Sequence, residues 1–313
     1  MYISDVLNKY ISELETRRKD LYEKYKQTIN WHIGVPILVG LTALLAVGIP
    51  QAFLVGTAIS AVISGIVYAI NIGYPFSKLK KALKVAVLQD LMSTFHPDVD
   101  YSYSNEKQEV RSIARDSGFF SASRYHEEDV IQGNYGAARF YISEIKLSRK
   151  QKKSRVTVFD GLLFKINMPG KNFPESRIQS RPGLLTKIFN GYQENNAFGF
   201  YYDTDNTYAF EEQLGSLFPF FRHLIQTNKD LRINIKGDEI VMFLNSDMDF
   251  LDDPTPKLKA PLLNNRYVES LAQQLNSLLF IVETLANDLN SEAIEERLEL
   301  KVLEYAENQG LNN

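Results

Sequence analysis

The longest apolar run of the chain extends from residue 31 to residue 77 and contains no Asp, Glu, Lys or Arg. A Pro-Gln pair divides its core into two segments, Trp31–Ile49 and Ala52–Gly73. At about 1.5 Å per helical residue the segments are about 28 and 33 Å long, close to the roughly 30 Å hydrocarbon core of a bilayer. Only helices satisfy their own backbone polar groups in lipid, so the pattern predicts a transmembrane helical hairpin over residues 31–73.

Two other structures have a similar pattern, a secretory signal peptide and a buried helical hairpin of a soluble protein. The signal peptide is disfavoured because residues 1–30, which precede the run, are rich in acids as well as bases. The soluble hairpin is disfavoured because both consecutive segments are long and uncharged.

Small residues recur at helical spacing along the second segment. One row consists of Thr57, Ala61, Gly65, Ala69 and Gly73, and the other of Gly56, Ser60 and Ser64. Such rows let helix backbones approach closely, so we expect them to pack the hairpin against itself, opposite Gly40 and Gly48. The residues expected at this contact are Gly56, Ser60, Ala61 and Gly65. Oligomerisation through the same rows is the alternative.

Basic residues flank the hairpin at both outer ends, whereas the turn between the two segments has none. The positive-inside rule therefore predicts that both termini are cytoplasmic and that the turn lies on the opposite side. Trp31 and Tyr74 are then expected at the same membrane interface. The flanking bases are Arg17, Arg18, Lys19, Lys24 and Lys26 before the run, and Lys78, Lys80, Lys81 and Lys84 after it.

The segments that flank the hairpin are predicted to be helical. In residues 1–30, apolar positions repeat in fours and threes, so this amphipathic helix has a heptad-like seam that needs a partner helix. Pro36 is expected in the first turns of the first membrane helix, where a missing N–H costs little. Pro75 is expected to end the second membrane helix, and Ser77 to cap a juxtamembrane helix within residues 74–95.

The start of this juxtamembrane helix is rich in lysine, which allows two interpretations. Lysines beside a membrane either hold anionic lipid headgroups, at about 1 kcal/mol per base, or only set the topology. The candidate headgroup ligands are Lys78, Lys80, Lys81 and Lys84.

Between residues 96 and 253 the hydrophobic period changes and predicts an α+β cytoplasmic domain. Alternating apolar and polar residues predict a β-hairpin over 125–147, with its loop at 133–136. They also predict a strand over 156–168 with a bulge or a kink at Asp160–Gly161. The other expected elements are a helix at 106–117, an edge strand within 173–183, a short helix at 184–190, a strand at 197–202, a helix at 210–227 that includes Pro219, and a hairpin at 231–245.

A Pro-rich linker at 254–264 precedes a predicted C-terminal helix within residues 265–313. Beyond Asn287 this helix carries seven acids and two bases. Its acidic end is expected to pair with the basic N-terminal helix, or these helices are expected to recruit a second copy or another protein.

Composition excludes several classes of function. The net charge of −3 gives no electrostatic basis for binding nucleic acid. The absence of cysteine excludes disulfides and thiol chemistry. The six bases within residues 146–155 are interpreted as a solvated hairpin tip, with contact to phosphate or lipid as the alternative.

Candidate catalytic and metal-binding chemistry is sparse. The cluster His126–Asp129 combines one imidazole with three carboxylates, but adjacent residues point in different directions and chelate poorly as a set. The sequence contains no phosphate-binding loop and no Gly-x-Ser-x-Gly nucleophile elbow. We therefore expect no cofactor and no metal, and we expect that the protein is not an enzyme.

Several short segments occur in a characteristic order: EDVIQG at 128–133, RFYISEI at 139–145, VFDGLLF at 158–164, and Phe198 with Tyr201 and Tyr202 before a helix and a final hairpin. With the two apolar segments, they resemble a bacterial family of uncharacterised two-span membrane proteins, known only as a domain of unknown function. The resemblance implies an inner-membrane protein of this architecture over most of residues 20–250, and implies no catalytic residue.

The sequence leaves two candidate functions open. The first is a non-catalytic binding or scaffold module anchored in the inner membrane. The second is a membrane enzyme or lipid-handling protein, which would need a pocket with converging polar groups that faces the bilayer. The absence of a recognisable catalytic set favours the first. A channel is disfavoured because neither apolar segment carries a charged stripe.

Overall fold

The structure is a computed structural model that describes residues 5–47, 50–96, 98–102, 107–152, 154–180, 192–228, 230–245, 251, 258–261 and 265–287. Over these residues the chain is α+β, with long helices near the N-terminus, an antiparallel sheet, and a helix that begins at Asn265. The chain divides into two compact units, one made of Met1–Leu91 and Asp253–Ala272, the other of Met92–Asp252 and Gln273–Asn313.

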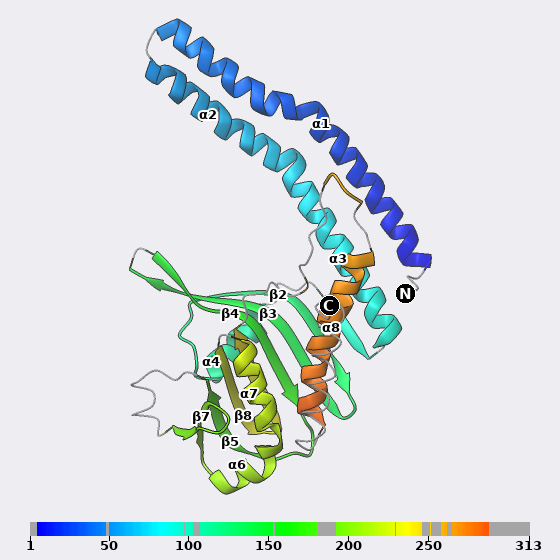
Figure 1. The fold of residues 1–313 in the computed structure, drawn as a ribbon, viewed down its shortest axis with the longest axis vertical. Coiled ribbons are helices and arrows are strands. Elements are labelled where there is room, and N and C mark those ends of the chain that lie inside the picture. Colours follow the sequence, from blue (N-terminus) through cyan, green and yellow to red (C-terminus); the bar gives the residue numbers. More distant parts are fainter. Residues whose placement is uncertain are drawn as a thin grey trace, which may run out of the picture. The chain divides into compact units, whose positions relative to one another are not determined.

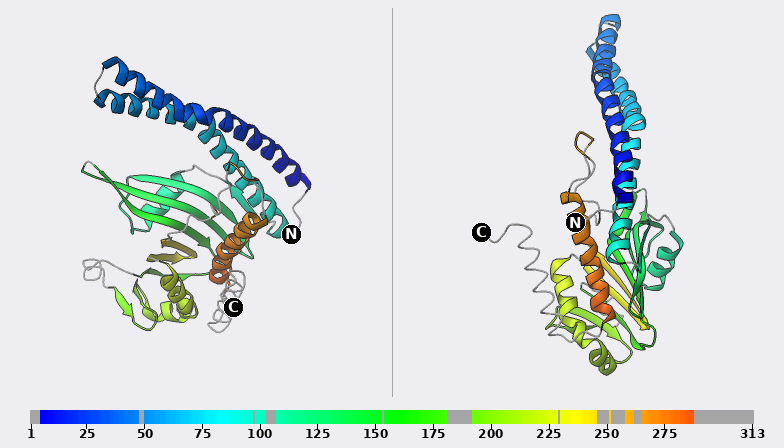
Figure 2. Two further views of the ribbon diagram at one scale, coloured as in Figure 1. Left: turned by 45° about the horizontal axis from the view of Figure 1, so that its top comes forward. Right: turned by 90° about the vertical axis from the view of Figure 1, so that its right-hand side faces the viewer.

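The first unit is built on consecutive long helices. Helix α1 (Asp5–Val47) and helix α2 (Pro50–Tyr68) lie side by side as an antiparallel helical hairpin (Figures 1 and 2). A π-helical turn (Ala69–Gly73) connects α2 directly to helix α3 (Tyr74–Phe95). The predicted amphipathic helix and the first apolar segment are therefore one continuous helix.

The prediction that Pro75 ends the second apolar helix is wrong. The backbone N–H of Tyr74 donates to the carbonyl of Ala69, five residues earlier, as in a π-turn. A proline is costly inside an α-helix because it lacks an N–H and its ring meets the carbonyl four residues back. The wider π-turn just before Pro75 reduces this conflict, so the helix continues and Ser77 lies within it rather than at its cap.

The second unit contains a nine-stranded sheet in which all neighbouring strands are antiparallel, in the order β1-β2-β3-β4-β9-β8-β5-β7-β6. Its longest strands, β2, β3 and β4, lie next to one another in Figure 1. The strands are β1 (Val99–Ser102), β2 (Arg124–Tyr135), β3 (Ala138–Gln151), β4 (Ser154–Asn167), β5 (Phe173–Gln179), β6 (Gln193–Asn195), β7 (Phe200–Thr204), β8 (Asp230–Gly237) and β9 (Glu239–Asn245). The predicted hairpins at 125–147 and 231–245 are confirmed.

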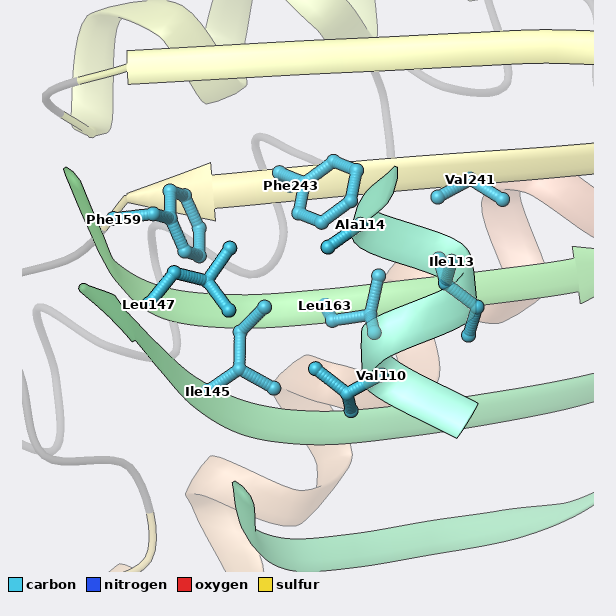
Figure 3. Close-up of a cluster of buried hydrophobic side chains, with 9 residues drawn as sticks. All are labelled: Val110, Ile113, Ala114, Ile145, Leu147, Phe159, Leu163, Val241 and Phe243. Atoms are coloured by element: carbon cyan, nitrogen blue, oxygen red, sulfur yellow. The ribbon is translucent and has the colours of Figure 1, made fainter. Parts of the chain in front are cut away.

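One face of the sheet packs against helix α4 (Lys107–Asp116), which forms within the predicted range. Its apolar positions recur at helical spacing, so one side of this polar helix is buried. Figure 3 shows the resulting cluster over β3, β4 and β9. The cluster consists of Val110, Ile113, Ala114, Ile145, Leu147, Phe159, Leu163, Val241 and Phe243.

Helix α7 (Phe218–Thr227) and, from Gln273 onward, helix α8 (Asn265–Ala286) lie on the other side of the sheet (Figure 2). Aromatic rings fill this side: the Phe200 and Phe218 centroids are 5.1 Å apart. The ring centroids of Phe220 and Phe280 are 6.4 Å apart, which joins α7 to α8.

The single helix predicted over 210–227 is interrupted. Helix α6 (Thr207–Leu214) begins at the N-cap Asn206, whose side chain accepts a hydrogen bond from the Ala209 N–H. A 3₁₀ turn (Gly215–Leu217) follows, and α7 starts so that Pro219 lies in its first turn. Proline needs no donor partner there, so the chain begins a new helix instead of kinking an old one.

Two strand predictions need correction. Strand β5 is not an edge strand, because it pairs with β8 on one side and with β7 on the other. Gly161 is paired in regular register, and the shift between β3 and β4 lies beside Leu147 and Ser148. The predicted helix at 184–190, most of the linker at 254–264 and the chain beyond Asn287 lie outside the described residues.

Candidate functional site

Helices α1 and α2 expose a continuous apolar surface. Large apolar side chains on both helices are more than half exposed, among them Ile33, Leu45 and Leu54. Two helical stretches, Asn8–Leu45 and Leu54–Ser93, are long and apolar enough to cross a membrane. Only 11% of the apolar 18-residue part of each stretch is buried. A core helix of a soluble protein would be mostly buried.

A polar contact joins the two helices of the hairpin. Pro36 lies inside α1 rather than near its start, so the carbonyl of His32, four residues earlier, has no helical donor. The Ser64 hydroxyl of α2 donates to this carbonyl at 3.1 Å. The His32 Nδ1 lies 2.8 Å from the same hydroxyl oxygen. The single hydrogen of the hydroxyl is used for the carbonyl, so in the second hydrogen bond the Nδ1–H of His32 donates to the Ser64 oxygen.

The small residues of α2 divide into two sides of the helix. A Cβ on Gly56 would lie 3.2 Å from the Ala43 Cβ of α1, so the backbones approach closely here. Ser60 is buried on the same side. Ala61 and Gly65 are exposed, and no atom lies within 4 Å of a Cβ placed on Gly65. The row that contains Gly56, Ser60 and Ser64 therefore faces α1, whereas Ala61 and Gly65 of the other row do not pack against it.

A groove of about 470 Å³ lies between α1 and α3 in the first unit. Its wall includes the buried side chains of Leu14 and Leu79. The exposed bases Arg17 and Lys24 of α1 and Lys78 of α3 also line it, together with the carboxylate of Asp20. The groove therefore combines apolar walls with an excess of positive charge.

The four lysines at the start of α3 lie in different environments. Lys78 lines the groove and its Nζ is 4.6 Å from the centre of the Tyr74 ring. Lys80 lies over the Phe76 ring, outside the groove lining. Lys81 is exposed, and Lys84 is only 6% exposed. Of these four lysines, Lys78 lines the groove together with Arg17 and Lys24 of α1.

The His126–Asp129 cluster lies on β2 and its side chains diverge. His126 Nε2 is 2.5 Å from Glu128 Oε1 at the surface. Glu127 and Asp129 are buried, and the Tyr101 hydroxyl donates to Asp129 Oδ1 at 2.6 Å. Asp129 has a φ of 50°, because the β2–β3 register shifts between Glu128 and Ile131. Among the described residues, no group of three or more His, Asp or Glu side chains could hold a metal ion.

A partly buried tyrosine pairs with a buried carboxylate in the same part of the sheet. The Tyr141 hydroxyl of β3 donates to Glu127 Oε1 of β2. Burial, followed by this hydrogen bond and the charge of Glu127, raises the pKa of Tyr141 well above its ordinary value. The phenol therefore stays protonated and acts as a fixed donor to the carboxylate, which is a structural role.

The second unit has a cleft of about 380 Å³ between the β2–β3 turn and α8. Tyr135, Phe140 and Phe280 supply aromatic surface. Polar groups converge on the same space from several elements, and they are those of His96, Asp98, Asn134, Asn276 and Glu283. Such a mixture of aromatic walls and a few polar groups is typical of small-ligand sites.

Sequence reasoning missed the groove and the His32–Ser64 contact. Arg17 and Lys24 appeared only as topology charges, because their convergence with Lys78 depends on how α1 packs against α3. For the second contact a signal was present: a proline inside a helix leaves a carbonyl without its donor four residues earlier.

No protein-family model matches this chain, and no curated protein matches it. Among solved structures, the crystal structure of the mycobacterial trehalose monomycolate transport factor A, TtfA, aligns over 62% of this chain and 93% of that chain, with 10% sequence identity and a TM-score of 0.28. A TM-score this low supports no conclusion about fold or function. The family resemblance seen in the sequence therefore stays a prediction.

Proposed function

We propose that this protein is a two-span inner-membrane protein whose α+β domain is a non-catalytic binding or scaffold module in the cytoplasm. The observation that carries the proposal is the apolar surface of the α1–α2 hairpin, where Leu45 is 83% exposed and Leu54 is 66% exposed. An exposed apolar surface of this extent is stable only against lipid or another protein. The length of each helix and the lack of charge across residues 31–77 favour lipid.

The proposed orientation has both termini in the cytoplasm. Bases flank the hairpin before Trp31 and after Ser77, and none occurs in the turn between α1 and α2. Trp31 and Tyr74 are exposed where the apolar surface ends, as interfacial aromatic residues are. The β-rich domain follows α3 on the cytoplasmic side in this orientation.

The binding role extends to protein partners or a second copy of the chain. It is supported by the amphipathic start of α1 and by the acidic composition beyond Asn287, which complement each other in charge. Cross-linking in membranes, followed by recovery in a mild detergent, is expected to give a discrete protein adduct. Recovery of lipid with no protein adduct would contradict the scaffold role.

A lipid-handling protein or enzyme is the second candidate function, and the cleft beside α8 is the observation that favours it. The cleft has aromatic walls and several converging polar groups, as a site for a small ligand requires. Its lining also includes His96, Asp98 and Glu283, side chains that can act as an acid, a base or a nucleophile, so this candidate includes catalysis as well as binding.

The membrane topology can be tested directly because the chain has no cysteine. Single cysteines would replace the exposed residues Ser12 and Ser102, and Gln51 next to the turn. In spheroplasts, an impermeant maleimide is expected to label Gln51→Cys at once, and the other two variants only after permeabilisation. The opposite labelling pattern would overturn the orientation, and labelling of all three variants only after permeabilisation would overturn membrane insertion.

A further inference from the structure

The groove between α1 and α3 carries unneutralised positive charge. Arg17, Lys24 and Lys78 line it, and Asp20 is the acid in its lining. Other bases of the same helices have partners: Arg18 pairs with Glu15 and Lys26 with Glu23, each at 2.5 Å. Within the described residues, no carboxylate lies in ion-pair distance of Arg17, Lys24 or Lys78.

Three bases converge with one carboxylate, that of Asp20, so the net positive charge of the groove favours an anion. The apolar walls of the groove favour an anion that also has an apolar part. Leu14 and Leu79 are 2% and 5% exposed, and they border the same space as the three bases. A ligand that is anionic at one end and apolar at the other would satisfy both features, whereas a small inorganic anion would leave the apolar wall unused.

The position of the groove along the helices corresponds to the headgroup layer of the membrane. This step rests on the proposed membrane insertion. Tyr74, which is 61% exposed, ends the apolar surface of the continuous α2–α3 helix. Lys78 lies four residues, or about 6 Å, beyond it, and Lys24 lines the same groove from α1. The headgroup layer extends about 5–8 Å beyond the hydrocarbon core on each side. The two lysines are therefore at or just beyond the level of lipid phosphates.

We propose that this groove is a specific site for an anionic phospholipid of the cytoplasmic leaflet. Lys24 and Lys78 hold the headgroup phosphate from opposite helices, and Arg17 adds positive charge from α1. The glycerol backbone contacts the apolar wall and the acyl chains extend along the hairpin. The site thus uses one lysine of α3 with bases of α1, rather than the lysine cluster of α3 as a whole.

The test is native mass spectrometry of the full chain in a non-ionic detergent, titrated with phosphatidylglycerol or phosphatidylcholine. The unmodified chain is expected to bind one phosphatidylglycerol at least tenfold more tightly than phosphatidylcholine. The double variant K24Q/K78Q is expected to bind phosphatidylglycerol about 30-fold more weakly, since two bases at about 1 kcal/mol each correspond to that factor.

The matched control is K19Q/K80Q, which removes the same charge from the same two helices outside the groove lining. It is expected to change phosphatidylglycerol binding by less than twofold. Equal weakening in both double variants would overturn the proposal, because it would show diffuse attraction instead of a site. Competition by millimolar inorganic phosphate would also overturn it, because the ligand would then be free phosphate.

By charge alone, the acidic segment beyond Asn287 is the alternative ligand for these bases. Replacing its seven acids by amides in the full chain is expected to leave phosphatidylglycerol binding unchanged within twofold. A gain of tenfold or more would show that this segment fills the groove, and would overturn the lipid assignment. Failure of the site and failure of the proposed function are distinguishable: a chain that resists extraction from membranes but shows no phosphatidylglycerol preference contradicts only the site.

Discussion

The hydrogen bond from Tyr141 to the buried Glu127 allows a direct test of the packing within the sheet. Tyr141→Phe removes one hydroxyl that donates to Glu127 Oε1 and changes no other part of the ring. Glu127 is only 1% exposed, so water cannot replace the lost donor without local opening of the sheet. The substitution therefore leaves a buried carboxylate with weaker solvation.

The expected cost follows from the burial of the acceptor. A hydrogen bond to a charged buried group contributes about 1.5–3 kcal/mol, so we expect the free energy of unfolding of this unit to fall by about 2 kcal/mol. With a urea m-value of about 2 kcal/mol per molar for a unit of this size, the midpoint falls by about 1 M. The matched control is Tyr201→Phe, which removes a donor to Glu194 at the exposed edge of the sheet and is expected to change stability by less than about 0.5 kcal/mol.

The assay is urea unfolding of the full chain in a mild detergent, followed by far-ultraviolet circular dichroism of the sheet. A fall in the midpoint for Tyr141→Phe that greatly exceeds the fall for Tyr201→Phe agrees with the reasoning. Equal midpoints for Tyr141→Phe and the unmodified chain would refute it, because Glu127 would then need no donor from Tyr141.

Three further predictions concern other parts of the chain. Ser64→Ala removes the donor to the His32 carbonyl and is expected to destabilise the hairpin by about 1 kcal/mol in thermal unfolding in detergent. Thr42→Ala, which removes an exposed hydroxyl of α1, is the control. Equal stability of the two variants would contradict the contact. Burial lowers the pKa of His223, so the unfolded state binds the proton first as the pH falls, and stability is expected to decline below about pH 6.5. His223→Gln is expected to reduce the change of the urea midpoint between pH 7.5 and 5.5. An unchanged pH dependence of the midpoint would contradict this role of His223. A Cβ on Gly133 would collide with the Asp98 carbonyl and lie 2.8 Å from the Val99 Cα. Gly133→Ala is therefore expected to detach β1 and to speed amide exchange at Val99. The control Gly215→Ala, where no atom lies within 4 Å of the added Cβ, is expected to leave this exchange unchanged.

Local sequence patterns were sufficient for elements that local forces determine. The alternation around the 133–136 loop predicted the β2–β3 hairpin, and helical spacing of Val110, Ile113 and Ala114 predicted the buried side of α4. The α+β class followed from the change of period after residue 96.

The failures occur where the outcome depends on a neighbour or on an unusual turn. Pro75 follows a π-turn that no periodicity indicates, and Pro219 starts a new helix after a 3₁₀ turn. Strand β5 has an irregular sequence but gains partners on both sides from strands distant in the chain. The groove was hidden for the same reason, because Lys24 and Lys78 are 54 positions apart and converge only when α1 packs against α3.

The most direct test of the central claim is the partition of the chain after membranes are washed with alkaline carbonate and centrifuged without detergent. Two apolar helices that span the bilayer predict that the chain stays entirely in the membrane pellet and is released only by detergent. Recovery of the chain in the supernatant as a monodisperse monomer would contradict the account, because the exposed apolar surface of α1 and α2 would then need no lipid.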